Sequence, residues 1–306
     1  MSDPLHVVVM LGGPSAEREV SLRSGAAVAG ALRGLGHRVT ELDPRPGAWA
    51  LPAGTDVIFL ALHGTYGEDG AIQAELEALG VPFTGCDATA SRLAFDKVLT
   101  KERCNAAGVA TPRHLVVQDR KAPWPAGWRP PLVVKPARQG SSVGLRFVDH
   151  PSGWPEALDA ALRHDDAALI EERIVGPELT AGILDGRVLP LVEVRPHSGA
   201  YDYSSKYSAG ATEYLCPAPL DAAATDRVQG AARRAFAAVG GRDYARVDVM
   251  LDAAGNPWVL EVNTLPGMTE TSLLPKAAAA AGMPFPALCG KMVELALHRG
   301  ARQPVP

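Results

Sequence analysis

The chain has 306 residues, of which 47% are hydrophobic and 21% are charged, so it can bury a core and is not intrinsically disordered. This length favours two domains and allows three small ones. Thirty basic and 34 acidic side chains leave a formal net charge of −4, which gives no general positive field for nucleic acid or an anionic membrane. No apolar run approaches the ~20 residues of a membrane helix. We therefore expect no nucleic-acid or membrane partner.

The first apolar segment and the cysteines exclude further classes of protein. The first apolar run has no preceding lysine or arginine and stops at Gly12, which is typical of a first strand and not of a secretory signal. The four cysteines are far apart in the sequence. They predict neither a zinc site nor a disulfide framework, and we expect reduced thiols.

Strand and helix patterns alternate over the first hundred residues, which predicts βαβ units in an α/β sheet. Continuous β-branched runs indicate strands buried on both faces, and apolar residues at helical spacing indicate the helices between them. The expected elements are strands at 6–11, 37–43, 56–64 and 81–84 and helices at 22–35, 72–79 and 96–109.

The segments 111–120 and 122–131 break this alternation, and we place a domain boundary near residue 100. A polar segment at 197–215 has a length typical of lids and binding loops. The other expected elements are strands at 131–135, 145–148 and 168–175, hairpins at 179–194 (turning at 185–186) and 244–263, and helices at 154–163, at 222–239 and near the carboxyl end.

The hairpin at 244–263 gathers polar side chains on one face. If its strands pair symmetrically about the turn at 252–256, Asp248 lies opposite Glu261 and Arg246 lies opposite Asn263. Carboxylate and amide oxygens on rigid strands suit Mg²⁺; the alternative is a solvated face with one cross-strand ion pair. The residues expected to point into the core are Val247, Val249, Leu260 and Val262.

A glycine–serine loop over 135–144 joins two expected strands. Its glycines let backbone N–H groups approach an anion, and Lys135 adds a positive charge, although an ordinary hairpin turn is an alternative. The loop is not a Walker A motif. It also contains GxSxG, but a strand follows where a hydrolase nucleophile elbow needs a helix, so a hydrolase is disfavoured.

Two further loops, 12–19 and 63–70, follow expected parallel strands at their carboxyl ends, where open α/β sheets bind ligands. A carboxylate such as Glu17 could hold an ammonium group there, and His63 could hold a carboxylate. The alternative for the acidic residues is a place at a helix start, favoured by the helix dipole.

Together, these segments resemble the D-alanine–D-alanine ligase family of the ATP-grasp superfamily over nearly the whole chain. The resemblance implies an α/β and α+β ATP-grasp fold of three domains: an amino-terminal parallel-sheet (Rossmann-like) domain at 1–98, a central domain at 99–185 and a carboxyl-terminal domain at 186–306. The segments that carry it are LGGPSAEREVSLRSG, HGTYGEDG, KPARQGSSVG, EERIVGPELT, YDYSSKYSAG and RVDVMLDAAGNPWVLEVNTLPGMTETSLLP.

The same resemblance implies the activity: ATP-dependent joining of two D-alanines through an acyl phosphate, with release of ADP and phosphate, for peptidoglycan synthesis. It implies ATP as substrate, two Mg²⁺ (or Mn²⁺) ions, a homodimer and a cytoplasmic location.

The family's functional positions map onto this sequence. The implied nucleotide-binding residues are Lys97, Lys135, Ser142, Glu171, Arg173, Ile174, Glu178 and Asn263. The implied metal ligands are Asp248, Glu261 and Asn263. The implied catalytic residues are Glu17, Ser141, Lys206, Tyr207, Arg246 and Gly267. The implied D-alanine-binding residues are His63, Ser272 and Leu273.

Two other functions are compatible with the same ATP-binding residues. Another ATP-grasp carboxylate–amine ligase would change the D-alanine positions, which fit the family here. A non-catalytic nucleotide-binding regulator would have no use for Arg246 as an oxyanion donor. One position departs from the family pattern: Arg173 stands where some members carry a large aromatic residue, so we expect altered packing at the adenine edge.

Overall fold

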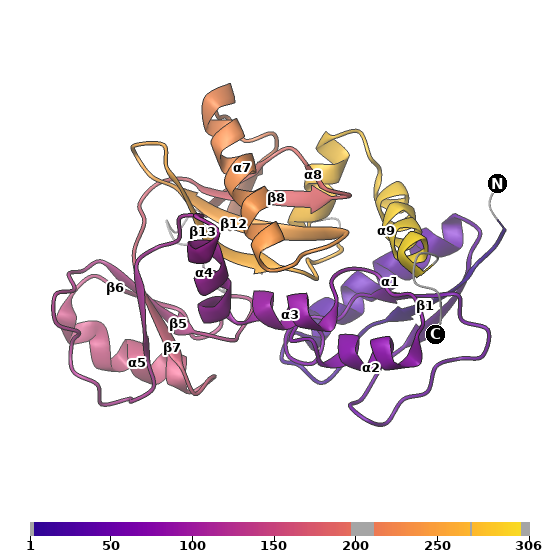
Figure 1. Ribbon diagram of the computed structural model, residues 1–306, viewed down its shortest axis with the longest axis horizontal. Helices are drawn as coiled ribbons and strands as arrows, with labels where there is room; N and C mark the ends of the chain where they lie inside the picture. The colour runs from indigo at the N-terminus through magenta and orange to yellow at the C-terminus, as the bar shows by residue number, and fades with distance from the viewer. Residues whose placement is uncertain (1–2, 197–210, 270, 301–306) are drawn as a thin grey trace.

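The computed structural model describes residues 3–196, 211–269 and 271–300. Their strands form three sheets. Each sheet, together with the helices packed on it, is called a group here, and the three groups lie next to one another along the long axis of the molecule (Figure 1). Within these residues, no helix has both the length and the apolar character needed to cross a membrane.

The first sheet confirms the expected parallel α/β start. All five residues of its central strand are buried, as the β-branched run predicts. The segment 81–84 makes only an isolated bridge, from Phe83 to Ile58, so its prediction as a strand is wrong. The elements are β1 (His6–Met10), β2 (Arg38–Leu42) and β3 (Val57–Leu60), paired in the order β2-β1-β3, with α1 (Arg18–Gly34) and α2 (Ala71–Leu79).

Two consecutive helices, α3 (Ala88–Phe95) and α4 (Lys97–Ala106), lead away from this sheet. Only the second was expected. Asp87 caps the first by accepting a hydrogen bond from the Ala90 N–H, and Asp96 caps the second. Asp96 therefore separates two helices that the sequence pattern does not distinguish.

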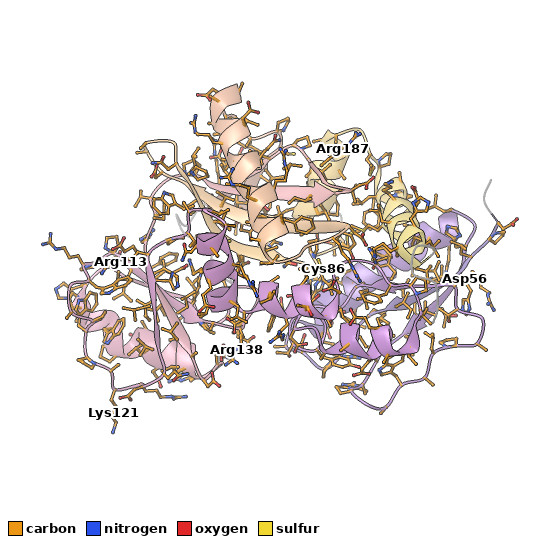
Figure 2. All side chains as sticks on the ribbon, viewed as in Figure 1. Asp56, Cys86, Arg113, Lys121, Arg138 and Arg187 are labelled. Atoms are coloured by element: carbon orange, nitrogen blue, oxygen red, sulfur yellow. The ribbon has the colours of Figure 1, made fainter. Side chains whose placement is uncertain are left out.

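The second sheet is antiparallel, and α5 packs on it (Figures 1 and 2). Its edge strand lies at 114–117, where no strand was expected, and it forms by pairing with 168–171. The elements are β4 (His114–Val117), β5 (Leu132–Pro136), β6 (Arg146–Val148) and β7 (Ala168–Glu172) in the order β4-β7-β5-β6, the short 3-10 helix η1 (Pro151–Gly153) and α5 (Trp154–Leu162).

The third sheet has six strands. Residues 212–215 form one of them, so the expected loop ends earlier than predicted; its part at 197–210 lies outside the described residues. β8 pairs with β12 here, although the expected central domain extends to residue 185; the domain limits stay a prediction. The elements are β8 (Glu178–Leu184), β9 (Arg187–Val188), β10 (Val192–Pro196), β11 (Thr212–Leu215), β12 (Tyr244–Leu251), β13 (Pro257–Asn263), α7 (Ala222–Ala238) and α8 (Leu273–Ala280).

The β12–β13 hairpin has the expected register near its open end. Asp248 pairs with Glu261, and Arg246 pairs with Asn263. A bulge follows, so Val249 pairs with Val259 and the extra residue, Leu260, is only partly buried. The prediction that Leu260 points into the core is wrong because the bulge moves the buried position to 259.

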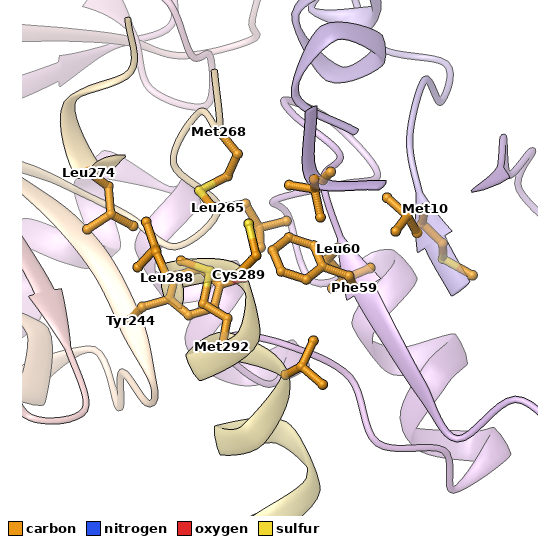
Figure 3. Close-up of a cluster of buried hydrophobic side chains, with 14 of the residues drawn as sticks. Met10, Phe59, Leu60, Tyr244, Leu265, Met268, Leu274, Leu288, Cys289 and Met292 are labelled. Carbon is orange, nitrogen blue, oxygen red and sulfur yellow. The ribbon is translucent and has the colours of Figure 1, made fainter. Parts of the chain in front are cut away.

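The last helix, α9 (Phe285–Gly300), returns to the beginning of the chain and packs against α1 and β3. Its Leu288, Cys289 and Met292 lie in one apolar cluster with Phe59 of β3 and Tyr244 of β12 (Figure 3). The first and third sheets therefore share a core that the two ends of the chain complete together.

Candidate active site

Two adjoining cavities, of about 430 and 420 Å³, lie where the three groups meet. The first cavity is lined by residues of the first and third groups and by the glycine–serine loop of the second group, and the second cavity is lined by residues of the second and third groups. Lys97, Gln139 and Glu261 line both. A molecule in one cavity can therefore contact a molecule in the other across a wall that carries one cation and one anion.

Glu17 lies in the first cavity, directly before α1. Its N–H donates to Ser15 Oγ at 3.1 Å, and Ser141 Oγ donates to its carboxylate. A Cβ atom at Gly140 would lie 2.6 Å from Glu17 Oε2, and one at Gly64 would lie 2.8 Å from it. A side chain at either position would therefore displace this carboxylate.

The glycine–serine loop contributes to both cavities. Ser141 and Ser142 have φ values of +53° and +57°, in the left-handed region that few residues other than glycine adopt. Ser141 lines the first cavity and Ser142 the second. The strained backbone thus directs two neighbouring hydroxyl-bearing residues to different ligand spaces.

His63 lies in the wall of the first cavity and is 5% exposed. Its Nδ1 lies 3.0 Å from the Leu265 carbonyl, which can only accept, so this nitrogen carries the proton and Nε2 accepts from Ser24 Oγ at 3.2 Å. Glu68 lies 3.4 Å from Nδ1. Burial raises the pKa of Glu68, although the hydrogen bond with His63 opposes this shift.

Among the residues that the structure describes, four charged side chains stand together at the junction of the cavities. Arg246 Nε and Nη2 donate to the two Asp248 oxygens at 2.9 and 2.8 Å, and Nη2 lies 3.8 Å from Glu261. Lys97 Nζ lies 3.4 Å from Glu261 and donates to the Gln139 carbonyl at 2.7 Å. The two cations balance the two carboxylates.

The same carboxylates are suitable ligands for a hard cation. Asp248 and Glu261 are direct partners across the hairpin, and Asn263 adds an amide oxygen, which accepts from the Leu265 N–H at 3.0 Å. Among the residues described, no group of three or more His, Cys, Asp or Glu could hold a metal. Two carboxylates and one amide oxygen fit Mg²⁺, which takes its remaining ligands from water and phosphates.

The far side of the first cavity is formed by the start of α8. Ser272 precedes the helix, and its Oγ accepts from the Thr269 N–H at 3.0 Å. A Cβ atom at Gly267 would lie 2.8 Å from Ser272 Oγ. The first N–H groups of α8, beginning at Leu273, therefore lie at the cavity, where an anionic group is favoured.

A buried carboxylate lies in the wall of the second cavity. Glu171 on β7 is 2% exposed and pairs with Lys135 Nζ at 2.7 Å and with Lys101 of α4. Burial by itself would raise the pKa of Glu171, but the attraction of Lys135 and Lys101 outweighs it and lowers the pKa to about 2. Glu171 is therefore an acceptor of hydrogen bonds only.

Arg173 lies against Phe147 in the second cavity, with its guanidinium carbon 4.5 Å from the ring centre and Nη1 3.5 Å from Asp149. The side chain therefore follows the cavity wall. Ile174 and Glu178 line the same space.

The structure brings the predicted site residues together. All of them line one or both cavities except Lys206 and Tyr207, which lie outside the described residues. Lys101, Glu68 and Gln139 belong to the site but were not expected from the sequence. Lys101 follows Lys97 by one helical turn, which could have placed both on one face of α4; no pattern pointed to Glu68.

Models of one family match the chain in two parts: "D-ala D-ala ligase C-terminus" over residues 120–294 and "D-ala D-ala ligase N-terminus" over residues 44–86. The D-alanine–D-alanine ligase of Methylacidiphilum infernorum is 47% identical over 97% of both chains. That of Syntrophotalea carbinolica is 48% identical over 94% of both.

Solved structures agree. The D-alanine–D-alanine ligase of Bacillus anthracis in complex with ATP has a TM-score of 0.84 and 32% identity over 98% of this chain and 99% of that one. The Coxiella burnetii ligase has a TM-score of 0.86 at 26% identity, covering 99% and 96%. The VanG D-Ala:D-Ser ligase of Enterococcus faecalis has a TM-score of 0.82 and 26% sequence identity, covering 96% of this chain and 99% of that one. The expected ATP-grasp fold is confirmed, and the chain belongs to the D-alanine–D-alanine ligase family.

Proposed function

We propose that this chain joins two D-alanine molecules into D-alanyl-D-alanine, with conversion of ATP to ADP and phosphate, for peptidoglycan precursor synthesis. The observation that carries the proposal is the shared wall of the two cavities, formed by Lys97, Gln139 and Glu261. With ATP in the second cavity and the amino acids in the first, the terminal phosphate and the attacking carboxylate meet at this wall. Such contact is what activation of a carboxylate by ATP requires.

In the first step, a carboxylate oxygen of the first D-alanine attacks the γ-phosphorus, and the bond to ADP breaks. An acyl phosphate forms. In the second step, the amine of the second D-alanine attacks the acyl carbon, phosphate leaves and the amine loses a proton. Negative charge grows on the phosphoryl group and then on the tetrahedral oxygen, and fixed donors aimed at that charge are usually the largest catalytic contribution.

The residues of the first cavity have matching chemistry. Glu17 holds the ammonium of the first D-alanine, and His63 lies near its carboxylate. Arg246 and the Gly267 amide face the developing oxyanion. Ser272 and the Leu273 amide, at the start of α8, hold the carboxylate of the second D-alanine, which the helix dipole supports.

The residues of the second cavity suit a nucleotide. Lys97, Lys135 and Ser142 contact the phosphates, and Glu178 holds the ribose hydroxyls. Glu171 with the backbone at Arg173 and Ile174 lines the base. The family resemblance assigns Lys206 to the γ-phosphate and assigns Tyr207, with Ser141 and Glu17, to closure of the site.

Asp248, Glu261 and Asn263 would hold two Mg²⁺ or Mn²⁺ ions, which would neutralise phosphate charge during transfer. Arg246 and Lys97 already contact these carboxylates, so the chain's own cations keep the ligands paired when no metal is bound. The homodimer and the cytoplasmic location stay predictions of the family resemblance.

Phosphate release from ATP, measured with and without D-alanine, tests the proposal. We expect release that depends on D-alanine and a dipeptide product in equal amount. Release that needs a different amino acid would support another ATP-grasp ligase, and nucleotide binding without release would support a regulator.

Offering D-alanine together with D-serine or D-lactate tests the second substrate, because a D-Ala:D-Ser ligase is among the similar structures. We expect mainly D-alanyl-D-alanine at neutral pH. Mostly mixed dipeptide or depsipeptide would contradict the proposed second substrate and leave the ATP chemistry in place.

A further inference from the structure

Lys101 is a buried lysine that lies behind the active site. It is 1% exposed and lines neither of the two cavities. Within the described residues, its ammonium contacts the Glu171 carboxylate, Thr111 Oγ1 at 2.5 Å and the Pro112 carbonyl at 3.4 Å. A charge this deep is unfavourable unless another charge compensates it, so its partner Glu171 explains its presence.

Glu171 has two cations, and they differ in access to the cavity. Lys135 is bound to Oε2 at 2.7 Å and lines the second cavity, at the root of the glycine–serine loop. Lys101 is bound to Oε1 from the opposite, closed side. One ammonium is therefore available to a ligand, and the other is not.

This difference matters when a triphosphate arrives. If Lys135 turns toward a phosphate, it weakens its bond to Glu171, and a buried carboxylate without a cation would be strongly unfavourable. Lys101 remains in contact and keeps the carboxylate paired. Lys135 can then serve the phosphate without loss of the negative charge at 171.

We propose that Lys101 is a positioning residue: it holds Glu171 as an anion in the wall of the base site, so that Lys135 is shared with the nucleotide phosphates and the site prefers a 6-amino purine over a 6-keto purine. This inference rests on the proposed function, in which ATP occupies the second cavity. An ionised carboxylate only accepts hydrogen bonds. It therefore favours the 6-amino group of adenine and repels the 6-keto oxygen of guanine.

The test compares Lys101→Met with wild type. Methionine fills a similar volume and removes the charge. We expect KM for ATP and the calorimetric Kd for a non-hydrolysable ATP analogue to rise by about tenfold or more, the loss typical of a charged hydrogen bond. We expect kcat to change by less than about threefold and the preference for ATP over GTP to fall.

Lys121→Met is the matched control, because this lysine is exposed and extends into solvent from the segment between β4 and β5 (Figure 2); it should leave all three quantities unchanged. A folded Lys101→Met protein with wild-type KM, Kd and ATP preference would overturn the inference. A wild-type protein that neither binds nor hydrolyses ATP would instead overturn the proposed function.

Lys101→Met alone can unfold the protein, because it leaves Glu171 with one cation. The double variant Lys101→Met with Glu171→Gln removes both charges, so the effect of Lys101 can be measured without an unpaired buried carboxylate. If Lys101 acts through Glu171, the double variant and Glu171→Gln alone should have the same KM for ATP and the same ATP preference within about twofold. A full, independent effect of Lys101→Met in a chain that already carries Glu171→Gln would refute a role through Glu171.

Discussion

Replacing Arg246 with methionine removes the guanidinium that holds Asp248 through two hydrogen bonds of 2.9 and 2.8 Å and approaches Glu261 at 3.8 Å. As an oxyanion donor, it should contribute about 3–4 kcal/mol to the transition state, so kcat should fall by about 10²–10³-fold. The net charge of the cluster would fall by one unit. A divalent cation should therefore bind more tightly to the variant than to wild type.

The two expected changes go in opposite directions, and this separates catalysis from damage to the fold. Calorimetry with Mn²⁺ measures the cation, and coupled phosphate release measures kcat. Arg246→Lys keeps the charge and should keep cation affinity near wild type while recovering part of kcat. Arg120→Met is the control, because it removes an exposed Arg–Asp pair and this arginine lines neither cavity. A kcat for Arg246→Met within about threefold of wild type would refute the assigned role.

Single contacts lead to three more predictions. Gly140→Ala places a methyl group 2.6 Å from the Glu17 carboxylate, so KM for D-alanine should rise by about tenfold or more while the unfolding temperature stays near wild type; an unchanged KM would contradict this packing. Leu288→Ala empties a fully buried position and should lower the free energy of unfolding in urea by about 2–5 kcal/mol; a loss below about 1 kcal/mol would contradict the shared core. The pKa of Glu171 is lowered in the folded protein to about 2, so the stability it contributes is complete above the unfolded value of ~4.3 and is lost as pH falls toward 2. The free energy of unfolding of Glu171→Gln should therefore fall less steeply with pH between these values than that of wild type. An equally steep fall would count against the ionised pair.

The sequence predicted the charged hairpin well because two facts determine it: residues two apart share a strand face, and the turn at 252–256 sets the pairing. The pairs of Asp248 with Glu261 and of Arg246 with Asn263 follow from these facts. Leu260 did not follow, because a bulge depends on packing around the strand and has no signature in the alternation of apolar residues.

Other features depended on contacts between distant segments. Helix α3 was missed because its short, weakly patterned sequence is defined mainly by the Asp87 cap. The strand at 114–117 forms because β7 lies beside it. Lys101 could be placed on a helix from sequence, but its value depends on Glu171, 70 positions later. Local patterns do not report such partners.

The position of α9 has a consequence for how this protein is made. The helix that completes the core of the first sheet is synthesised long after that sheet, so the apolar side chains around Phe59 have no permanent cover until residues 285–300 have left the ribosome. Until then the nascent chain holds an unfinished amino-terminal unit, which a chaperone would recognise by its exposed apolar face. Completion of the first sheet therefore waits for residues 285–300, and truncated products lacking this helix should be removed by proteolysis.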